Sequence, residues 1–210
     1  MNKYFVGLDL GQSRDFTALA VVEYAETRGD WDAVTFAHRV ETVLRLRHVE
    51  RVPLGTGYPE IVERVAEVMR SEALRGHSEL IVDGTGVGRP VVDLLRNRGM
   101  KCWVRPVIVT GGLRETEEGG YYGVPKRDLV LGLQVAVQSG ALKIAAGLQF
   151  GPALVKEMAE MKVRVTPSGN EQFGAWREGA HDDLVFAVAL ACWGAEKWRP
   201  RPMEGQGRLI

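Results

Sequence analysis

The chain has 210 residues, of which 45% are hydrophobic and 26% are charged, a composition typical of one globular domain with a sizeable core. Its 27 basic residues balance its 27 acidic residues, so a polyanionic partner has to be held by a local group of cations or by metal ions. The two cysteines, Cys102 and Cys192, lie far apart in apolar runs, which argues against a disulfide scaffold; we expect a cytoplasmic protein without a signal peptide or membrane span.

The first part of the chain predicts an antiparallel meander of three strands. The expected strands are Tyr4–Leu10, Thr17–Tyr24 and Ala33–Val40, with the turns at residues 11–15 and at Gly29-Asp30. Connections this short join antiparallel neighbours.

The chain then changes to alternating helices and strands. Apolar residues at helical spacing predict an amphipathic helix over Tyr58–Leu74. A strand over Glu79–Asp83, a helix over Arg89–Asn97 and a strand over Cys102–Val109 follow. A meander followed by β-α-β units predicts a mixed sheet with helices on both faces.

The C-terminal part predicts further helices, a short strand and a hairpin. After a Gly- and Glu-rich loop over 110–120, the expected elements are a helix over Pro125–Gln138, a strand over Ala141–Ile144, a helix over Pro152–Met161, a β-hairpin over Val163–Trp176 and a last helix over Asp182–Trp198. The remaining residues predict a mobile tail.

Two of the expected strands end in an aspartate, Asp9 in VGLDLG and Asp83 in LIVDGTGVG. A carboxylate in such a place either initiates a turn through the backbone of the next loop or is neutralised by a positive group. If the two strands are parallel neighbours, their carboxyl ends open on the same edge of the sheet. The two carboxylates would then converge, and their repulsion would require a cation between them.

A third acidic position lies at the start of the last expected helix, where His181, Asp182 and Asp183 follow one another. Aspartate at a helix start is a favoured cap, so one of the two aspartates is expected to do only that. Asp183 shares a stripe with three alanines spaced four residues apart, and such a stripe lets a helix lie close to a sheet. We therefore predict Asp183 as the inward ligand and Asp182 as a cap or neighbouring partner, while His181 either assists proton transfer or is an ordinary loop histidine.

This set of acids predicts a site for hard divalent cations. Three or four carboxylates without a histidine–cysteine cluster suit Mg²⁺ or Mn²⁺ and not zinc. Two such ions, held roughly 3.5–4 Å apart, activate a water and stabilise the leaving oxygen of a phosphodiester. We therefore predict nuclease chemistry with Asp9, Asp83 and Asp183 as catalytic ligands and Asp182 as a further metal ligand.

Two other sequence patterns point to nucleotide binding. The glycines of segment 84–88 resemble a phosphate loop, but the chain has no G-x-x-x-x-G-K-[ST] motif, which excludes a P-loop ATPase. Asp9-Leu10-Gly11 followed by Thr17 also resembles the first phosphate loop of actin-like kinases, whose duplicated domain needs a longer chain. An actin-like nucleotide-binding module remains an alternative.

Basic residues gather in several short segments. Lys126 and Arg127 open an expected helix and are the predicted DNA-binding candidates. A second group comprises Arg45, Arg47, His48 and Arg51, and it either contacts phosphates or forms a solvated face.

Four segments of the chain carry a recognisable pattern: VGLDLG with Asp15 and Thr17, LIVDGTGVG at 80–88, VPKRDL at 124–129 and HDDLVFA at 181–187. In this order and spacing they resemble the nuclease domain of the large terminase subunit of tailed phages. The resemblance runs from Tyr4 to about Trp198. It implies an RNase H-like mixed five-stranded sheet of order 3-2-1-4-5 with strand 2 antiparallel, flanked by helices, with an additional hairpin before the C-terminal helix.

The resemblance also implies function and site residues. Residues 1–198 would form a nuclease domain that cuts double-stranded viral DNA during packaging with two Mg²⁺ or Mn²⁺ ions, and residues 199–210 a flexible tail. The family's metal-binding acids correspond to Asp9, Asp83 and Asp183. Asp15 corresponds to a further acid near the metals in some members, and Asp15 and His181 are candidates beside the ligands.

The resemblance further implies partners and a location. In the bacterial host cell these would be a packaging ATPase, the small terminase subunit and the portal. A large terminase carries its motor ahead of its nuclease, so we expect either a separately encoded motor, an isolated domain or a prophage remnant. A Holliday-junction resolvase-like nuclease and a non-catalytic packaging component remain alternatives.

Overall fold

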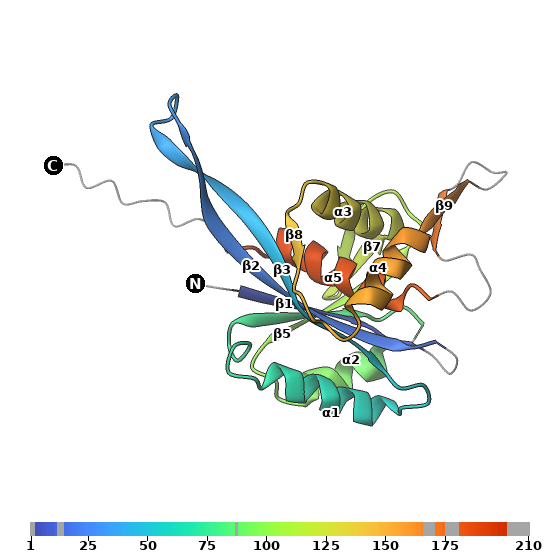
Figure 1. Ribbon diagram of the computed structural model, residues 1–210. Helices are drawn as coiled ribbons and strands as arrows, with labels where there is room; N and C mark the ends of the chain where they lie inside the picture. The colour runs from blue at the N-terminus through green and yellow to red at the C-terminus, as the bar shows by residue number, and fades with distance from the viewer. Residues whose placement is uncertain (1–2, 12–14, 87, 166–170, 175–180, 201–210) are drawn as a thin grey trace.

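A computed structural model describes residues 3–11, 15–86, 88–165, 171–174 and 181–200. One mixed sheet lies in the middle of the molecule, and helices cover both of its faces (Figure 1). A second, two-stranded sheet is separate from it.

The main sheet has eight strands in the order β6-β7-β5-β4-β1-β2-β3-β8. The strands are β1 (Lys3–Asp9), β2 (Thr17–Asp32), β3 (Ala37–Val52), β4 (Ser78–Asp83), β5 (Trp103–Thr110), β6 (Thr116–Glu118), β7 (Tyr121–Pro125) and β8 (Leu142–Ile144). Its five central strands have the predicted order, with β2 antiparallel to β1 and β3. β4 is parallel to β1, and β5 is parallel to β4. The predicted RNase H-like core of the sheet is therefore confirmed, and β6, β7 and β8 extend it at its edges.

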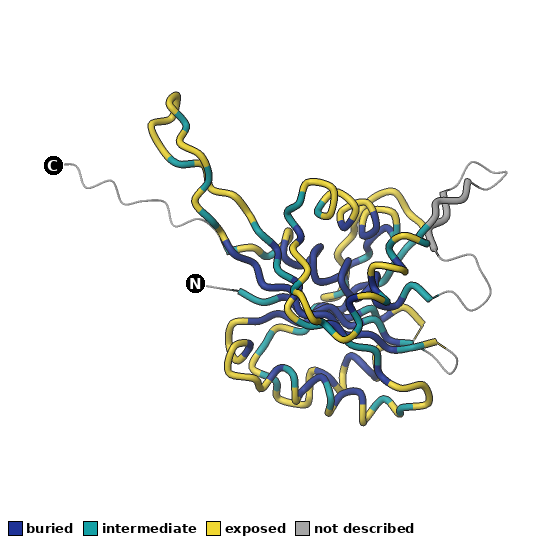
Figure 2. Tube along the Cα trace, in the orientation of Figure 1, coloured by how far each residue is buried: buried dark blue, intermediate teal, exposed yellow. Residues whose placement is uncertain are grey.

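The helices form a layer on each face of the sheet. They are α1 (Tyr58–Met69), α2 (Gly88–Asn97), α3 (Lys126–Gln138), α4 (Gly151–Glu160) and α5 (Asp183–Lys197). α1 and α2 cover one face, and α3, α4 and α5 cover the other (Figure 1). The buried part of the chain follows the sheet and the inner sides of these helices (Figure 2).

α5 is the central helix of its layer. Every residue from Asp183 to Ala195 is buried, as expected for a helix that is apolar on all sides. It packs on β1, where a Cβ atom built on Gly7 would lie 1.9 Å from the carbonyl oxygen of Ala187 and 2.8 Å from the amide nitrogen of Ala191. The predicted stripe of small residues on α5 therefore does face the sheet at close range, and it brings Asp183 to the end of β1.

The predicted bounds of the meander were wrong at its second turn. Gly29 and Asp30 lie inside β2, and the chain turns at residues 33–36, where Asp32 Oδ1 accepts hydrogen bonds from the amide groups of Val34 (2.9 Å) and Thr35 (3.4 Å). β2 and β3 are therefore 16 residues each, and their distal halves form a long arm that extends beyond the body of the molecule (Figure 1). The arm has no core to cover, so its sequence lacks the apolar alternation that marks a strand.

Other elements differ from prediction less. The loop expected over 110–120 contains β6, which pairs antiparallel with the unpredicted strand β7. The hairpin expected before the last helix is present as β9 (Lys162–Val165) paired with β10 (Glu171–Gly174), while residues 166–170 and 175–176 lie outside the described part. Residues 201–210 of the expected tail also lie outside it. Within the described chain, no helix is both long enough and apolar enough to cross a bilayer.

Candidate active site

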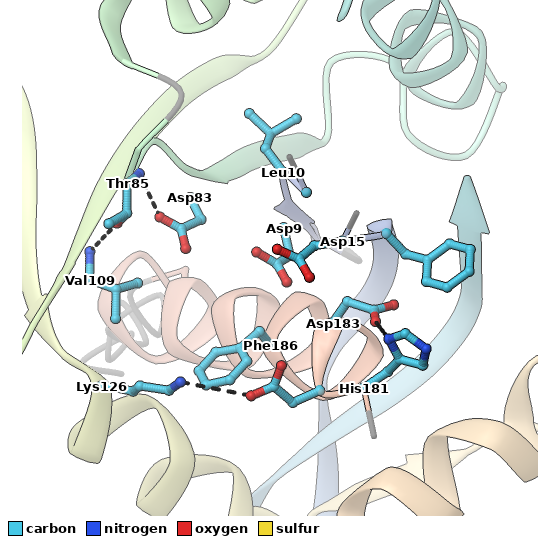
Figure 3. Close-up of a pocket in the computed structure, with 13 residues that line it drawn as sticks. Asp9, Leu10, Asp15, Asp83, Thr85, Val109, Lys126, His181, Asp183 and Phe186 are labelled. Carbon is cyan, nitrogen blue, oxygen red and sulfur yellow. Dashed lines mark hydrogen bonds and ion pairs between the residues drawn. The ribbon is translucent and has the colours of Figure 1, made fainter. Parts of the chain in front are cut away.

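A pocket of about 290 Å³ opens where β1 and β4 end and α5 begins (Figure 3). Its lining contains most of the residues predicted to form the site. The lining residues are Asp9, Leu10, Gly11, Asp15, Phe16, Asp83, Thr85, Val109, Lys126, His181, Asp182, Asp183 and Phe186.

Asp9 and Asp83 reach the pocket from adjacent parallel strands. Leu8 of β1 pairs with Val82 of β4, so the next residue of each strand lies at the same edge of the sheet. Asp83 Oδ1 accepts a hydrogen bond from the amide of Thr85 (2.8 Å), and the Thr85 hydroxyl accepts one from the amide of Val109 (2.8 Å). The glycine-rich loop thus fixes the Asp83 carboxylate and ties it to β5.

The acids that line the pocket affect the pKa of Asp9. Burial raises its pKa well above the usual value, and the negative charges of Asp83, Asp183 and Asp182 raise it further, while Lys126 acts in the opposite direction. Burial also raises the pKa of Asp83 and of Asp183. The sheet edge and the start of α5 therefore bring the four acids into one electrostatic environment.

Asp183 is held by an arginine that the sequence did not connect with the site. Arg51, near the end of β3, donates from Nε to Asp183 Oδ2 (2.6 Å) and from Nη2 to Oδ1 (3.1 Å). The same Nη2 also donates to Oε1 of Glu157 in α4. Arg51 therefore pairs with the acids beside the pocket and is not part of a solvated face. Arg45 and Arg47, from the same basic group, pair instead with Glu23.

Glu157 also takes the role of a cap for α5. Its Oε2 accepts hydrogen bonds from the amides of Leu184 (3.2 Å) and Val185 (3.4 Å), which have no partners within the helix. Asp182 occupies the N-cap position, but its side chain makes no capping hydrogen bond. Its carboxylate instead lies 3.7 Å from Lys126 Nζ.

The other residues that the sequence predicted for the site differ in their position relative to the pocket. His181 Nδ1 is 3.8 Å from Asp183 Oδ1, and its ring meets the Phe16 ring edge-on at 5.0 Å. Asp15 is exposed and lines the pocket (Figure 3). Lys126 Nζ lies 4.3 Å from the centre of the Phe186 ring. Arg127 is exposed and is not part of the pocket lining.

The metal-free protein is expected to lose stability as the pH rises from 5 to 7.5. Burial and then the charge of Asp183 raise the pKa of Glu157 from 4.5 to about 7, and the pKa values of Asp9, Asp83 and Asp183 are raised as well. Such groups bind protons more tightly when folded, so their contribution is complete below pH 4.5 and is lost as the pH passes the folded pKa. Melting curves in EDTA should show a decrease of about 5 °C or more, which Glu157→Gln should reduce. A constant or rising melting temperature over this range would contradict the prediction.

The donor chemistry of the pocket fits a hard divalent cation. Six carboxyl groups, those of Asp9, Asp15, Asp83, Asp182, Asp183 and Glu157, lie in or against the pocket. With the two cations Arg51 and Lys126 they leave an excess of four negative charges when all are ionised. Carboxylate oxygens are the ligands that Mg²⁺ and Mn²⁺ prefer. Among the described residues, no three acidic, histidine or cysteine groups already have the arrangement of a metal site. Arg51 pairs with Asp183, and Lys126 pairs with Asp182 just before α5.

Comparison with solved structures identifies the fold. The chain is similar to the large terminase nuclease from thermophilic phage G20c with bound magnesium (TM-score 0.63, 21% identity, 91% of this chain and 81% of that chain). It is also similar to the large terminase nuclease domain of Thermus phage P74-26 (TM-score 0.60, 18% identity, 95% of this chain and 82% of that chain). The nuclease domain of the bacteriophage SPP1 large terminase with bound Mn is a further similar structure (TM-score 0.55, 13% identity, 93% of this chain and 86% of that chain). No protein-family model and no curated protein matches the sequence. The chain therefore has the RNase H-like fold of phage large terminase nuclease domains.

Proposed function

We propose that the chain is a divalent-metal-dependent endonuclease that hydrolyses phosphodiester bonds of double-stranded DNA and acts in phage DNA packaging. The observation that carries the proposal is the convergence of Asp9, Asp83 and Asp183 from three separate elements in one pocket with a large negative excess. The fold of the terminase nucleases supports it, as do the Mg and Mn ions that two of those neighbours hold. A packaging ATPase, the small terminase subunit and the portal, in the cytoplasm of the host cell, are the partners and location that this role implies.

In this proposal Asp9, Asp83, Asp183 and Asp182 hold two Mg²⁺ or Mn²⁺ ions. Such ions supply Lewis-acid stabilisation of the charge on the phosphodiester and activate the attacking water. The Thr85 amide keeps the Asp83 carboxylate in a fixed orientation. His181, whose Nδ1 faces Asp183, is placed to accept a proton on its other ring nitrogen.

Cleavage of supercoiled plasmid tests the function directly. Wild-type protein should convert the plasmid to nicked and linear forms with Mn²⁺ or Mg²⁺ and leave it intact in EDTA. A strong preference for four-way junctions over linear duplex would assign the protein to the resolvase-like nucleases instead. Binding of ATP without any cleavage would indicate an actin-like module, and Mn²⁺ binding without cleavage would indicate a non-catalytic packaging component.

Lys126 is expected to contribute to cleavage of DNA. It is the lysine of the pocket lining, and a cation there can bind a phosphate oxygen once ions have neutralised the acids. Lys126→Met should lower kcat/KM for plasmid nicking by about tenfold, equivalent to about 1.4 kcal/mol, and Arg127→Met, outside the lining, should lower it less. Lys143→Met is the matched control because Lys143 is exposed on β8 and does not line the pocket. Equal losses in Lys126→Met and Lys143→Met would refute this role.

A further inference from the structure

Arg51 places a cation against a carboxylate that the proposed function assigns to metal ions. Its side chain is 15% exposed, and its guanidinium donates to both oxygens of Asp183, at 2.6 and 3.1 Å. A positive charge in this position stabilises the ionised acid when no metal is bound. The same charge repels any divalent ion that the acid binds, and the repulsion is strong because the group is shielded from water.

The surroundings of Arg51 keep this charge in place. Glu157, on α4, accepts a further hydrogen bond from Nη2, and it is itself fixed by the amides of Leu184 and Val185. The ring of Phe16 covers the guanidinium at 4.7 Å from its centre. Leaving this position would therefore break hydrogen bonds to two buried carboxylates, so Arg51 is expected to stay beside Asp183 when ions bind.

We propose that Arg51 is a built-in counter-ion of the site: it neutralises and positions Asp183 in the metal-free protein and thereby weakens the binding of divalent cations. The inference rests on the proposed metal-dependent function and adds to it what limits the affinity for the metal. When ionised, Glu157 has the opposite effect, because its negative charge offsets that of Arg51. The two residues together set how strongly Asp183 attracts an ion.

If Arg51 acts through its charge, substitutions should change the affinity for Mn²⁺ differently than if it only supports the structure. Arg51→Gln removes the cation, so the affinity for Mn²⁺ should rise at least tenfold while the metal-free protein melts at a lower temperature. Arg51→Lys keeps the charge but not the bidentate contact with Asp183, and its affinity for Mn²⁺ should stay within about threefold of wild type. Glu157→Gln removes the offsetting charge, so the affinity should fall about fivefold or more. If Arg51 acted only as a structural support, all three variants would bind Mn²⁺ more weakly.

Calorimetric titration of the whole 210-residue chain with MnCl₂, after removal of metal with EDTA, measures these affinities. Melting curves with and without Mn²⁺ supply a second readout, and the increase in melting temperature caused by Mn²⁺ should be larger in Arg51→Gln than in wild type. Arg64→Gln is the matched control. Arg64 makes the same two-pronged contact with Glu50, at 2.9 and 2.7 Å, but outside the pocket, so its loss should leave the Mn²⁺ affinity unchanged.

Each result decides the proposal. An unchanged or weaker Mn²⁺ affinity in Arg51→Gln, with normal binding by wild type, overturns the role of Arg51 and leaves the proposed nuclease function intact. Absence of Mn²⁺ binding by wild type, or binding that persists in Asp83→Asn, overturns both. If Arg51→Gln does not fold, the other two variants decide: near-wild-type affinity in Arg51→Lys with weaker binding in Glu157→Gln supports the proposal, and any other combination overturns it.

Discussion

Asp9→Asn should abolish DNA cleavage and, at the same time, raise the melting temperature of the metal-free protein. Asparagine has nearly the same shape as aspartate but carries no charge. Burial and the charges of Asp83, Asp183 and Asp182 oppose ionisation of Asp9, so the neutral side chain removes an unfavourable interaction in the folded state. The same replacement removes a proposed metal ligand, and the rate of nicking should fall by a factor of about 10³ or more, equivalent to about 4 kcal/mol.

Initial rates of plasmid nicking in Mn²⁺ and melting curves in EDTA measure the two effects on one preparation. Asp83→Asn should show the same loss of activity with a smaller gain in stability, because Asp83 also accepts a hydrogen bond from Thr85. Asp93→Asn is the control, since Asp93 is an exposed residue of α2 outside the pocket, and both quantities should stay at wild-type values. Nicking by Asp9→Asn at a rate near that of wild type would exclude this site as the catalytic centre.

Gly7→Ala should destabilise the protein by about 3 kcal/mol or more. The new methyl group would lie 1.9 Å from the carbonyl oxygen of Ala187 and 2.8 Å from the amide nitrogen of Ala191, both of which are backbone atoms of α5. A rotamer change cannot relieve a clash with backbone, so β1 and α5 would have to separate, which opens the core between them. Because Asp9 and Asp183 belong to these two elements, activity should fall together with stability.

Urea unfolding of Gly7→Ala measures the free energy of unfolding, and Gly132→Ala provides a control of the same chemistry. Gly132 lies on an exposed side of α3, and a Cβ atom there meets nothing within 4 Å. Alanine favours the helix, so this variant should be more stable than wild type by about 0.5–1 kcal/mol. A Gly7→Ala protein as stable as wild type would show that α5 does not lie as close to β1 as the structure places it.

The acids of the site could be placed from sequence because local patterns decide their positions. Asp9 and Asp83 each end an apolar strand, and parallel strands present such residues at one edge. The spacing of small residues on the last helix identified the side of α5 that meets the sheet, and with it the direction of Asp183. In these cases the secondary structure alone determines where the side chain lies.

Other parts of the molecule depend on contacts that no local pattern reveals. Arg51 belongs to a basic segment of β3, and its partner Asp183 follows 132 residues later, so the segment resembles any solvated strand. Glu157 looks like an ordinary helix surface residue until α4 is packed against α5. In the described structure the distal halves of β2 and β3 pair with each other alone, and exposed side chains such as Trp31 and Val40 carry no signal of a buried face.

The central position of α5 also affects how the protein folds during its synthesis on the ribosome. The helix occupies positions 183–197, yet it fills the space between the sheet and the two other helices of its layer. While the chain is being synthesised, the part of the sheet that α5 covers, including β1 and β2, therefore stays uncovered until position 197 of these 210 residues has been made. Asp183 arrives with the same helix, so the pocket of a nascent chain lacks this carboxylate until α5 has been made and packed.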